Sequence, residues 1–314
     1  MLLAELGGDL QPAEQKLLDI RRSAQMAFPL VLVMGPSRSG TTLFVQWLAN
    51  TGVVAYPTNL LSRFYQTPII GAKIQLLLTD SRYDFRHELA EFTQQVDYGS
   101  ENGKTRGALA PNEFWYFWRR FLSDPARDVW TDRELSTSMD VQTLSAEFAG
   151  IMDVFRKPFL LKAMLFNYNI PFLNKIFDKV IFIRLVRDPI SNIASMLDAR
   201  KKQNGNIEQW YSFNIPEYEQ LKDLAPREQV AGQIYYVNKA IGEGLDGVAG
   251  QNQMTVRYEE FCKNPEPVYR ELVAKLDQHG YKVTGDYSPA GPFRATRTDM
   301  DEPELLEAYR KFSG

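Results

Sequence analysis

A short loop rich in glycine, serine and threonine, from Gly35 to Thr42, contains the residues best suited to chemistry in this sequence. It reads Gly-Pro-Ser-Arg-Ser-Gly-Thr-Thr and lies between an apolar run and a stretch with helical spacing. Glycines let backbone N–H groups curve around an anion, and the start of the following helix adds partial positive charge. The loop therefore predicts a phosphate site. A Walker loop would have Lys where Thr41 stands, so the cation of this loop is Arg38 instead.

The loop resembles the 5′-phosphosulfate loop of sulfotransferases that use 3′-phosphoadenylyl sulfate (PAPS). Its Arg-Ser-Gly-Thr-Thr-Leu run is most similar to the tyrosylprotein and carbohydrate branches, since the cytosolic small-molecule enzymes usually have Lys in place of Arg38. The resemblance implies a P-loop-like α/β fold, PAPS as co-substrate, PAP as product, and no metal. It also implies that the donor binds to six loop residues, namely Ser37, Arg38, Ser39, Gly40, Thr41 and Thr42.

A second motif follows another apolar run, and the same resemblance predicts its role. In the family, a strand ends in Arg, and a Ser eight positions later lies in the next helix; together they hold the 3′-phosphate. Here Arg187 follows the run 180–186, and Ser195 stands at the matching position. Arg offers a planar fork to phosphate and Ser adds a hydroxyl donor. The structural alternatives are that Arg187 pairs with Asp188 and that Ser195 only packs within a helix.

Lys162 stands inside an apolar run, Phe159–Leu165, where a buried lysine needs a partner or an anion. The resemblance implies a catalytic lysine here, directed at the bridging oxygen or the sulfuryl group, with Arg38 as a second catalytic cation. The alternative is a strand lysine that extends to solvent. In the cytosolic enzymes a catalytic His follows two positions later. This chain has Met164 there, so that base is not carried over.

Three further residues are predicted to contact the donor. Tyr258 resembles the tyrosine at a strand end that reaches the adenine in this family, although a tyrosine at the edge of the core would fit equally well. Arg294 and Arg297 are candidates to close over the 3′-phosphate, where relatives use a basic flexible segment. Leu43 stands where the cytosolic enzymes have a tryptophan that stacks on adenine.

A hydroxyl acceptor loses its proton as the new S–O bond forms, so a carboxylate or imidazole should lie nearby. We rank Glu113 first as this base, followed by His87 and Glu101. Two of them have a plainer interpretation: Glu113 would cap a helix, and the charges around His87 are typical of a solvated helix face. The aromatic run Phe114–Trp118 is interpreted mostly as core, with part of it available to line an acceptor pocket.

These residues need a scaffold in which strands and helices alternate, which is typical of a parallel sheet covered on both faces. The expected strands cover 29–34, 159–165, 180–186 and 254–258, and the expected helices cover 11–27, 41–50, 189 to about 200, and 266–278. We predict a single P-loop-like α/β domain over 1–314. In it, 28–52 binds the 5′ end of the donor, 158–200 binds the 3′-phosphate, and the mostly helical insertion 55–150 forms the acceptor pocket.

Composition excludes other classes of protein. The formal net charge of −3 over 314 residues argues against binding nucleic acid through bulk charge. A single cysteine, Cys262, and two histidines argue against a disulfide scaffold and against a cysteine or multi-histidine metal centre. No apolar stretch is long enough to span a membrane, and the N-terminus lacks a basic secretory signal. We therefore expect a cytoplasmic protein.

The leading functional hypothesis is transfer of a sulfuryl group from PAPS to a hydroxyl or an amine. A P-loop small-molecule kinase is the first alternative, but it would need Lys at position 41 and would leave the 3′-phosphate motif unexplained. A catalytically silent PAP-binding module is the second. The acceptor stays open at this point, among small molecules such as phenols, carbohydrates, lipids and carrier-bound hydroxyacyl groups.

Overall fold

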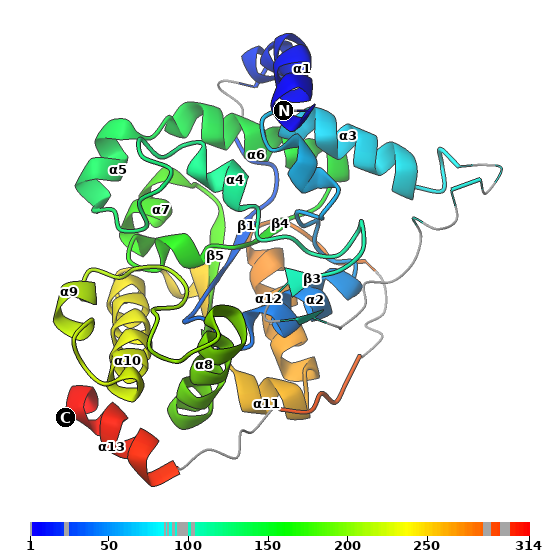
Figure 1. The fold of residues 1–314 in the computed structure, drawn as a ribbon. Coiled ribbons are helices and arrows are strands. Elements are labelled where there is room, and N and C mark those ends of the chain that lie inside the picture. Colours follow the sequence, from blue (N-terminus) through cyan, green and yellow to red (C-terminus); the bar gives the residue numbers. More distant parts are fainter. Residues whose placement is uncertain are drawn as a thin grey trace.

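Four parallel strands form the centre of the computed structural model, which describes residues 2–21, 25–84, 86, 88–89, 92, 100–101, 104–284, 290–295 and 302–314. The strand order is β4-β1-β5-β6, so β1 lies between the two strands that carry the other predicted motifs. The α/β fold with a central parallel sheet is confirmed (Figure 1). The strands are β1 (Leu30–Met34), β4 (Phe159–Lys162), β5 (Val180–Val186) and β6 (Gln253–Arg257).

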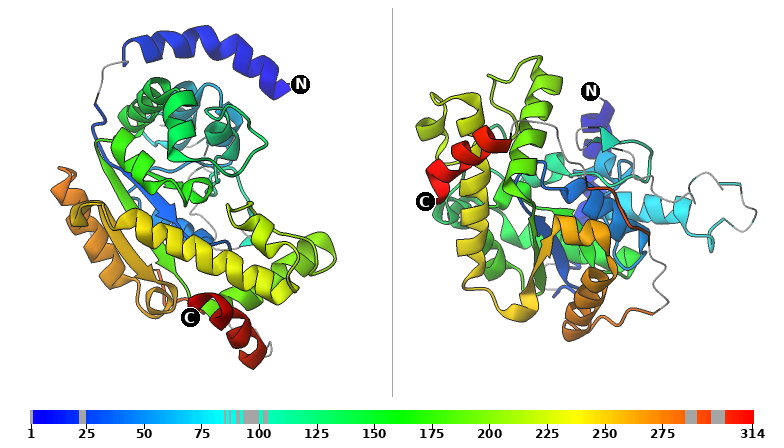
Figure 2. Two further views of the ribbon diagram at one scale, coloured as in Figure 1. Left: turned by 90° about the vertical axis from the view of Figure 1, so that its left-hand side faces the viewer. Right: turned by 90° about the horizontal axis from the view of Figure 1, so that it is seen from below.

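Strands β1, β4 and β5 are buried on both faces, because their apolar side chains alternate between two cores, whereas the edge strand β6 contributes to the second core only. One face packs on α6, α7 and α10, and the other on α2, α11 and α12 (Figure 2). The helices of the first face are α6 (Val141–Phe155), α7 (Ile170–Ile176) and α10 (Pro226–Leu245). Those of the second are α2 (Thr41–Asn50), α11 (Tyr258–Lys263) and α12 (Glu266–Gln278).

The segment between β1 and β4 consists mainly of helices, together with a two-stranded hairpin. Outside the sheet, α8, α10 and α13 pack on one another around a third core. No described helix is both long and apolar enough to cross a membrane. The remaining elements are α1 (Leu2–Asp19), η1 (Leu61–Phe64), α3 (Pro68–Thr79), β2 (Ser100–Glu101), β3 (Lys104–Thr105), α4 (Trp115–Arg119), α5 (Asp132–Ser138), η3 (Met164–Phe166), α8 (Pro189–Asn204), α9 (Tyr218–Leu221), η4 (Gly250–Asn252) and α13 (Glu302–Ser313).

Three predicted boundaries were wrong. The first helix covers 2–19 rather than 11–27. The strand expected over 159–165 ends at Lys162, because Ala163 leaves the extended conformation (φ −111°, ψ 31°) and a 3₁₀ turn follows. Tyr258 is the first residue of α11 rather than the end of a strand. The last two corrections matter for function, since they place Lys162 and Tyr258 at points where the chain changes direction.

Candidate active site

The glycine loop joins the end of β1 to the start of α2, as the sequence predicts. Gly40 has a φ of 95°, a left-handed conformation that favours glycine. A Cβ at this position would also lie 2.2 Å from the ring of Tyr258. Position 40 therefore excludes any side chain for two independent reasons, and the loop backbone lies directly against the first turn of α11.

Three side chains hold the loop from behind through its carbonyl groups. Asn167 donates to the Gly35 carbonyl at 2.9 Å, and its own oxygen accepts from the Gly35 N–H at 3.2 Å. Asn192 donates to the carbonyl of Ser37 at 2.9 Å. Arg187 donates to the carbonyl of Arg38 at 2.7 Å. With its carbonyls bound in this way, the loop keeps the arrangement that favours anion binding by backbone N–H groups.

Ser39 supplies an independent observation about what the loop is suited to hold. Its side chain is fully buried, and its hydroxyl has no hydrogen-bond partner among the described residues. A buried hydroxyl without a partner is costly in a folded protein unless a ligand or water satisfies it. The donor set of this loop therefore fits a phosphate or sulfate group.

Arg187, Ser195, Arg38 and Tyr258 form one cluster beside the loop. The Nε of Arg38 lies 3.4 Å from the hydroxyl of Ser195, and the guanidinium of Arg187 lies 5.1 Å from the centre of the Tyr258 ring. Burial lowers the pKa of Arg187 and raises the pKa of Tyr258 to about 12. Asp188, the alternative partner of Arg187, accepts a hydrogen bond from the Ser191 N–H at 2.8 Å and so caps α8.

Lys162, the last residue of β4, contacts the carboxylate of Glu113 and a hydroxyl in the first turn of α2. Its Nζ lies 2.8 Å from Glu113 Oε1 and 2.7 Å from the hydroxyl of Thr42. Only 5% of the Lys162 side chain is exposed, so the alternative of a lysine that extends to solvent is wrong. The structure thus brings the first-ranked base candidate into contact with the predicted catalytic lysine.

The carboxylate of Glu113 is held on its other side as well. Its Oε2 accepts a hydrogen bond from the indole Nε1 of Trp115. Glu113 lies before Phe114, the N-cap residue of α4, so it is not in the first turn of that helix. Its two oxygens bond the side chains of Trp115 and Lys162, so the capping interpretation of Glu113 is wrong. Most of the aromatic run belongs to the core, as predicted, because Phe114, Phe117 and Trp118 are buried, while Trp115 is partly buried.

Other predicted residues lie apart from this cluster or outside the described part of the chain. Glu101 belongs to the β2–β3 hairpin, and its side chain lies outside the described residues, as do His87 and Arg297. Arg294 is exposed. Its neighbour Phe293 donates a backbone hydrogen bond to the Cys262 carbonyl at 2.7 Å, which brings this segment next to α11. These four residues stay predictions.

A family model described as "Sulfotransferase family" matches residues 29–279, which include the glycine loop, Glu113, Lys162 and the Arg187 motif. The chain belongs to the sulfotransferase family. This membership favours the sulfotransferase hypothesis over a small-molecule kinase. No curated protein sequence matches the chain significantly.

Solved sulfotransferase structures share the fold. Sulfotransferase STF9 from Mycobacterium avium is 18% identical, with 86% of this chain and 68% of that one covered and a TM-score of 0.56. Sulfotransferase STF1 from Mycobacterium tuberculosis H37Rv is 13% identical, with 99% of this chain and 82% of that one covered and a TM-score of 0.50. At these identities the likeness concerns the fold alone.

Three residues that support this candidate site were not predicted from the sequence, namely Asn167, Asn192 and Trp115. Asn167 follows a buried strand, and Asn192 lies one helical turn before Ser195. A polar amide at such positions is a usable signal, since buried asparagines bond to nearby backbone. Trp115 gave no such signal, because its role depends on where Glu113 lies.

Proposed function

We propose that the protein transfers a sulfuryl group from PAPS to a hydroxyl or an amine of an acceptor by in-line attack. The observation that carries the proposal is the contact of Lys162 with Glu113 and Thr42 at the glycine loop. A cation suited to the leaving oxygen and a carboxylate suited to the acceptor proton lie next to each other. Both stand beside a loop that fits an anion, in a chain of the sulfotransferase family.

Each of the two donor motifs binds a different part of PAPS. In this proposal the loop from Ser37 to Thr42 holds the 5′-phosphosulfate, with the Ser39 hydroxyl and the backbone N–H groups as donors. Arg187 and Ser195 hold the 3′-phosphate, and Arg294 and Arg297 close over it. An anion is especially favourable for Arg187, since burial disfavours its charged form. Tyr258 supports the loop at Gly40 and borders the adenine.

The chemical step forms a bond from the acceptor oxygen to sulfur and breaks the bond from sulfur to the 5′-phosphate oxygen. Glu113 Oε1 takes the proton that the acceptor hydroxyl loses. Lys162 and Arg38 neutralise the charge that develops on the leaving phosphate oxygen. For this to happen Lys162 turns from Glu113 towards the donor, and this leaves the carboxylate able to act as a base.

PAP is expected to stabilise the folded protein, whereas ATP, which lacks a 3′-phosphate, is not. At a hundredfold excess of PAP over its dissociation constant, the stabilisation amounts to about 2.7 kcal/mol. For a chain of this size that corresponds to an increase in melting temperature of a few degrees. Thermal unfolding with each nucleotide measures it. Equal shifts with ATP and PAP, or no shift with PAP, contradict the proposed donor.

Arg187→Ala is expected to weaken PAP binding about 10- to 100-fold, because a hydrogen bond to a charged group contributes roughly 1.5–3 kcal/mol. Binding of adenosine 5′-monophosphate, which differs from PAP only in the 3′-phosphate, should weaken less than about threefold. Calorimetric titration of both ligands gives the comparison. Arg187 also holds the carbonyl of Arg38, so equal losses for the two ligands would mean that it supports the loop and does not recognise the 3′-phosphate.

A further inference from the structure

A pocket lies beside the glycine loop, between the end of β4, helix α10 and residues 210–216, which we call the cover segment. Ser37 lines it on the loop side and Met164 on the β4 side. The sulfur of Met164 is 3.8 Å from the hydroxyl of Thr41. Met164 also stands two residues after Lys162. The pocket therefore lies next to the place where the acceptor has to meet the donor.

The cover segment contacts both halves of the active site. The hydroxyl of Ser212 hydrogen-bonds that of Ser37 in the glycine loop. The ring of Phe213 packs 4.7 Å from that of Trp115, the residue that donates to Glu113. A ligand in the pocket would thus lie under a segment that is connected to the donor loop on one side and to the candidate base on the other.

Tyr211 gives a second indication of the same position. Burial raises the pKa of Tyr211; the charge of Arg38 lowers it and that of Glu113 raises it. The side-chain nitrogen of Gln233, in α10, donates to the carbonyls of Tyr211 at 3.3 Å and Phe213 at 3.2 Å. Helix α10 therefore holds the cover segment over the pocket through one glutamine.

The lining of the pocket is mainly apolar, and among the described residues that form it none is Lys or Arg. Its single acidic group, Asp128, is already neutralised, since Arg119 lies 2.6 Å from one oxygen and the backbone N–H of Asn214 lies 3.1 Å from the other. An anionic acceptor would find no counter-charge there. The apolar lining residues include Trp130, Leu165, Met196, Phe213, Ile215 and Val237.

Gln233 gives the pocket one specific polar feature. Only 3% of the residue is exposed, and its side-chain nitrogen is used by the two carbonyls of the cover segment. That use fixes the orientation of the amide, so that Oε1 is its remaining polar atom. Oε1 is buried, and it has no hydrogen-bond partner within the described part of the chain. A buried acceptor of this kind favours a ligand that brings an N–H or O–H group.

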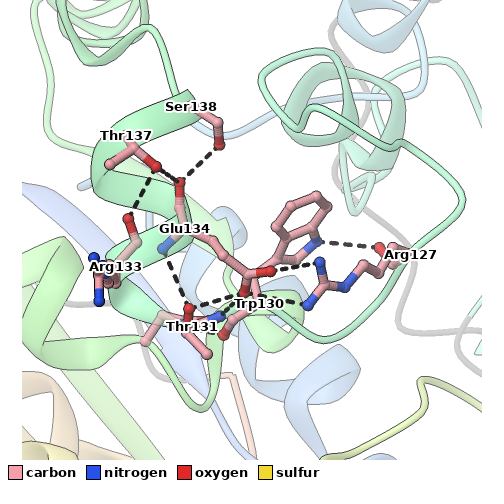
Figure 3. Close-up of polar contacts among 8 residues, drawn as sticks. Arg127, Trp130, Thr131, Arg133, Glu134, Thr137 and Ser138 are labelled. Carbon is pink, nitrogen blue, oxygen red and sulfur yellow. Dashed lines mark hydrogen bonds and ion pairs between the residues drawn. The ribbon is translucent and has the colours of Figure 1, made fainter.

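The part of the pocket lining around Trp130 is supported by several side-chain contacts. Figure 3 shows Trp130 next to Arg127, with the N-terminal end of α5 behind it. The guanidinium of Arg127 lies 4.5 Å from the centre of the Trp130 ring and bonds to Glu134 at 2.7 Å. Glu134 and Thr131 form a capping box at the start of α5. The indole of Trp130 is thus a well-supported apolar part of the pocket lining.

We propose that this pocket binds the part of the acceptor next to its reacting hydroxyl. This part is uncharged and mainly apolar, and it carries a hydrogen-bond donor, such as a secondary amide N–H, that Gln233 Oε1 recognises. The inference rests on the proposed sulfuryl transfer and specifies its acceptor class. Of the acceptors left open by the sequence, it favours neutral acyl compounds, such as carrier-bound hydroxyacyl groups, over carbohydrates.

Three phenols on one scaffold test the proposal, with kcat/KM measured in the presence of PAPS. They are the butyl amide of hydroxyphenylpropanoic acid, its N-methylated tertiary amide, and free hydroxyphenylpropanoate. We expect the secondary amide to be used best and N-methylation to lower kcat/KM about tenfold through one lost hydrogen bond. The carboxylate should be used more than about 100-fold less well, because its charge would be buried without a partner.

Two pairs of measurements connect these preferences to named residues. In Gln233→Met the N-methylation penalty should shrink to less than about twofold. This variant also loses the hydrogen bonds from Gln233 to the cover segment, which should lower kcat/KM for both amides by the same factor. The ratio of the two kcat/KM values therefore reports the contribution of Oε1 alone. In Asn214→Lys, whose exposed side chain lines the pocket, the carboxylate should gain about tenfold relative to the amide. The matched variant Asn214→Gln should leave that ratio unchanged.

Several outcomes would overturn this assignment. They are equal use of the amide and the carboxylate, a methylation penalty unchanged in Gln233→Met, and PAP binding without transfer to any of the three phenols. Failure of the protein to bind PAP would instead overturn the proposed function. PAP titration therefore accompanies every kinetic measurement, so that the two failures are distinguished.

Discussion

Replacing Lys162 with alanine is expected to lower the rate of sulfuryl transfer by about 10²–10³, in analogy with the loss of one preorganised donor from an oxyanion hole. Affinity for PAP should change less. The charge that Lys162 meets develops only as the bond from sulfur to the phosphate oxygen breaks, and interactions specific to the transition state act on kcat. Release of sulfate from PAPS, or transfer to a phenol, measures the rate, and calorimetry measures PAP binding.

Lys157→Ala is a matched control, since it removes a lysine just before β4, at the end of the strand opposite Lys162. The Nζ of Lys157 donates to the carbonyl of Gly52, far from the loop side of the sheet. This variant should keep its rate within about threefold, as expected for a group that contributes nothing to transition-state binding. A Lys162→Ala rate that is equally close to the parent would remove Lys162 from the mechanism.

Glu113→Gln is expected to lower kcat by about 10²–10⁴, the contribution typical of a positioned general base. Glutamine keeps the size of the side chain and an oxygen for the Trp115 indole. Its amide cannot take up the proton that the hydroxyl of the acceptor loses. The variant also leaves Lys162 without its carboxylate, so thermal unfolding and PAP titration should accompany the kinetics. An unchanged kcat in a folded, PAP-binding variant would exclude Glu113 as the base.

Trp115→Phe separates the chemistry of Glu113 from its orientation. This variant keeps the carboxylate and its contact with Lys162 but removes the indole donor to Oε2. The expected loss is about tenfold, as for one hydrogen bond, and thus clearly smaller than that of Glu113→Gln. If both variants lose the same activity, the indole and the carboxylate act as one unit and their effects are not additive.

Those parts of the fold that depend on local pattern were predictable from the sequence. The helices 41–50 and 266–278 and the strand 180–186 have the predicted bounds, because apolar spacing and flanking Gly, Asn or Asp-Pro residues delimit them. Helix α10 was missed, since it contains three glycines, which disfavour a helix and interrupt its apolar spacing. The sheet order was not predictable from these patterns, as strand neighbours depend on contacts distant in sequence.

The candidate site divides in the same way. The two donor motifs are local runs with a chemical reason for each residue, so the sequence suffices to propose them. The base is different, because Glu113 and Lys162 are separated by 49 positions and only the folded chain brings them together. The local sequence ranks Glu113 above Glu101 but does not show that Glu113 contacts Lys162. The cover segment was missed for a related reason, since its importance lies in what α10 holds it against.

The strand order has a consequence for how this protein can change its chemistry. Lys162 ends β4 and Arg187 follows β5, the two strands that flank β1, and the parallel register aligns Lys162 with Val33 and Val33 with Ile183. The separation of their backbones is therefore set by two interstrand spacings together with four residues along β5. A one-residue shift in strand register would turn every side chain of the strand to the opposite face, so point substitutions cannot adjust this distance. The cover segment, by contrast, lies outside the sheet. Acceptor preference is therefore free to diverge in variants of this protein whose nucleotide donor stays the same.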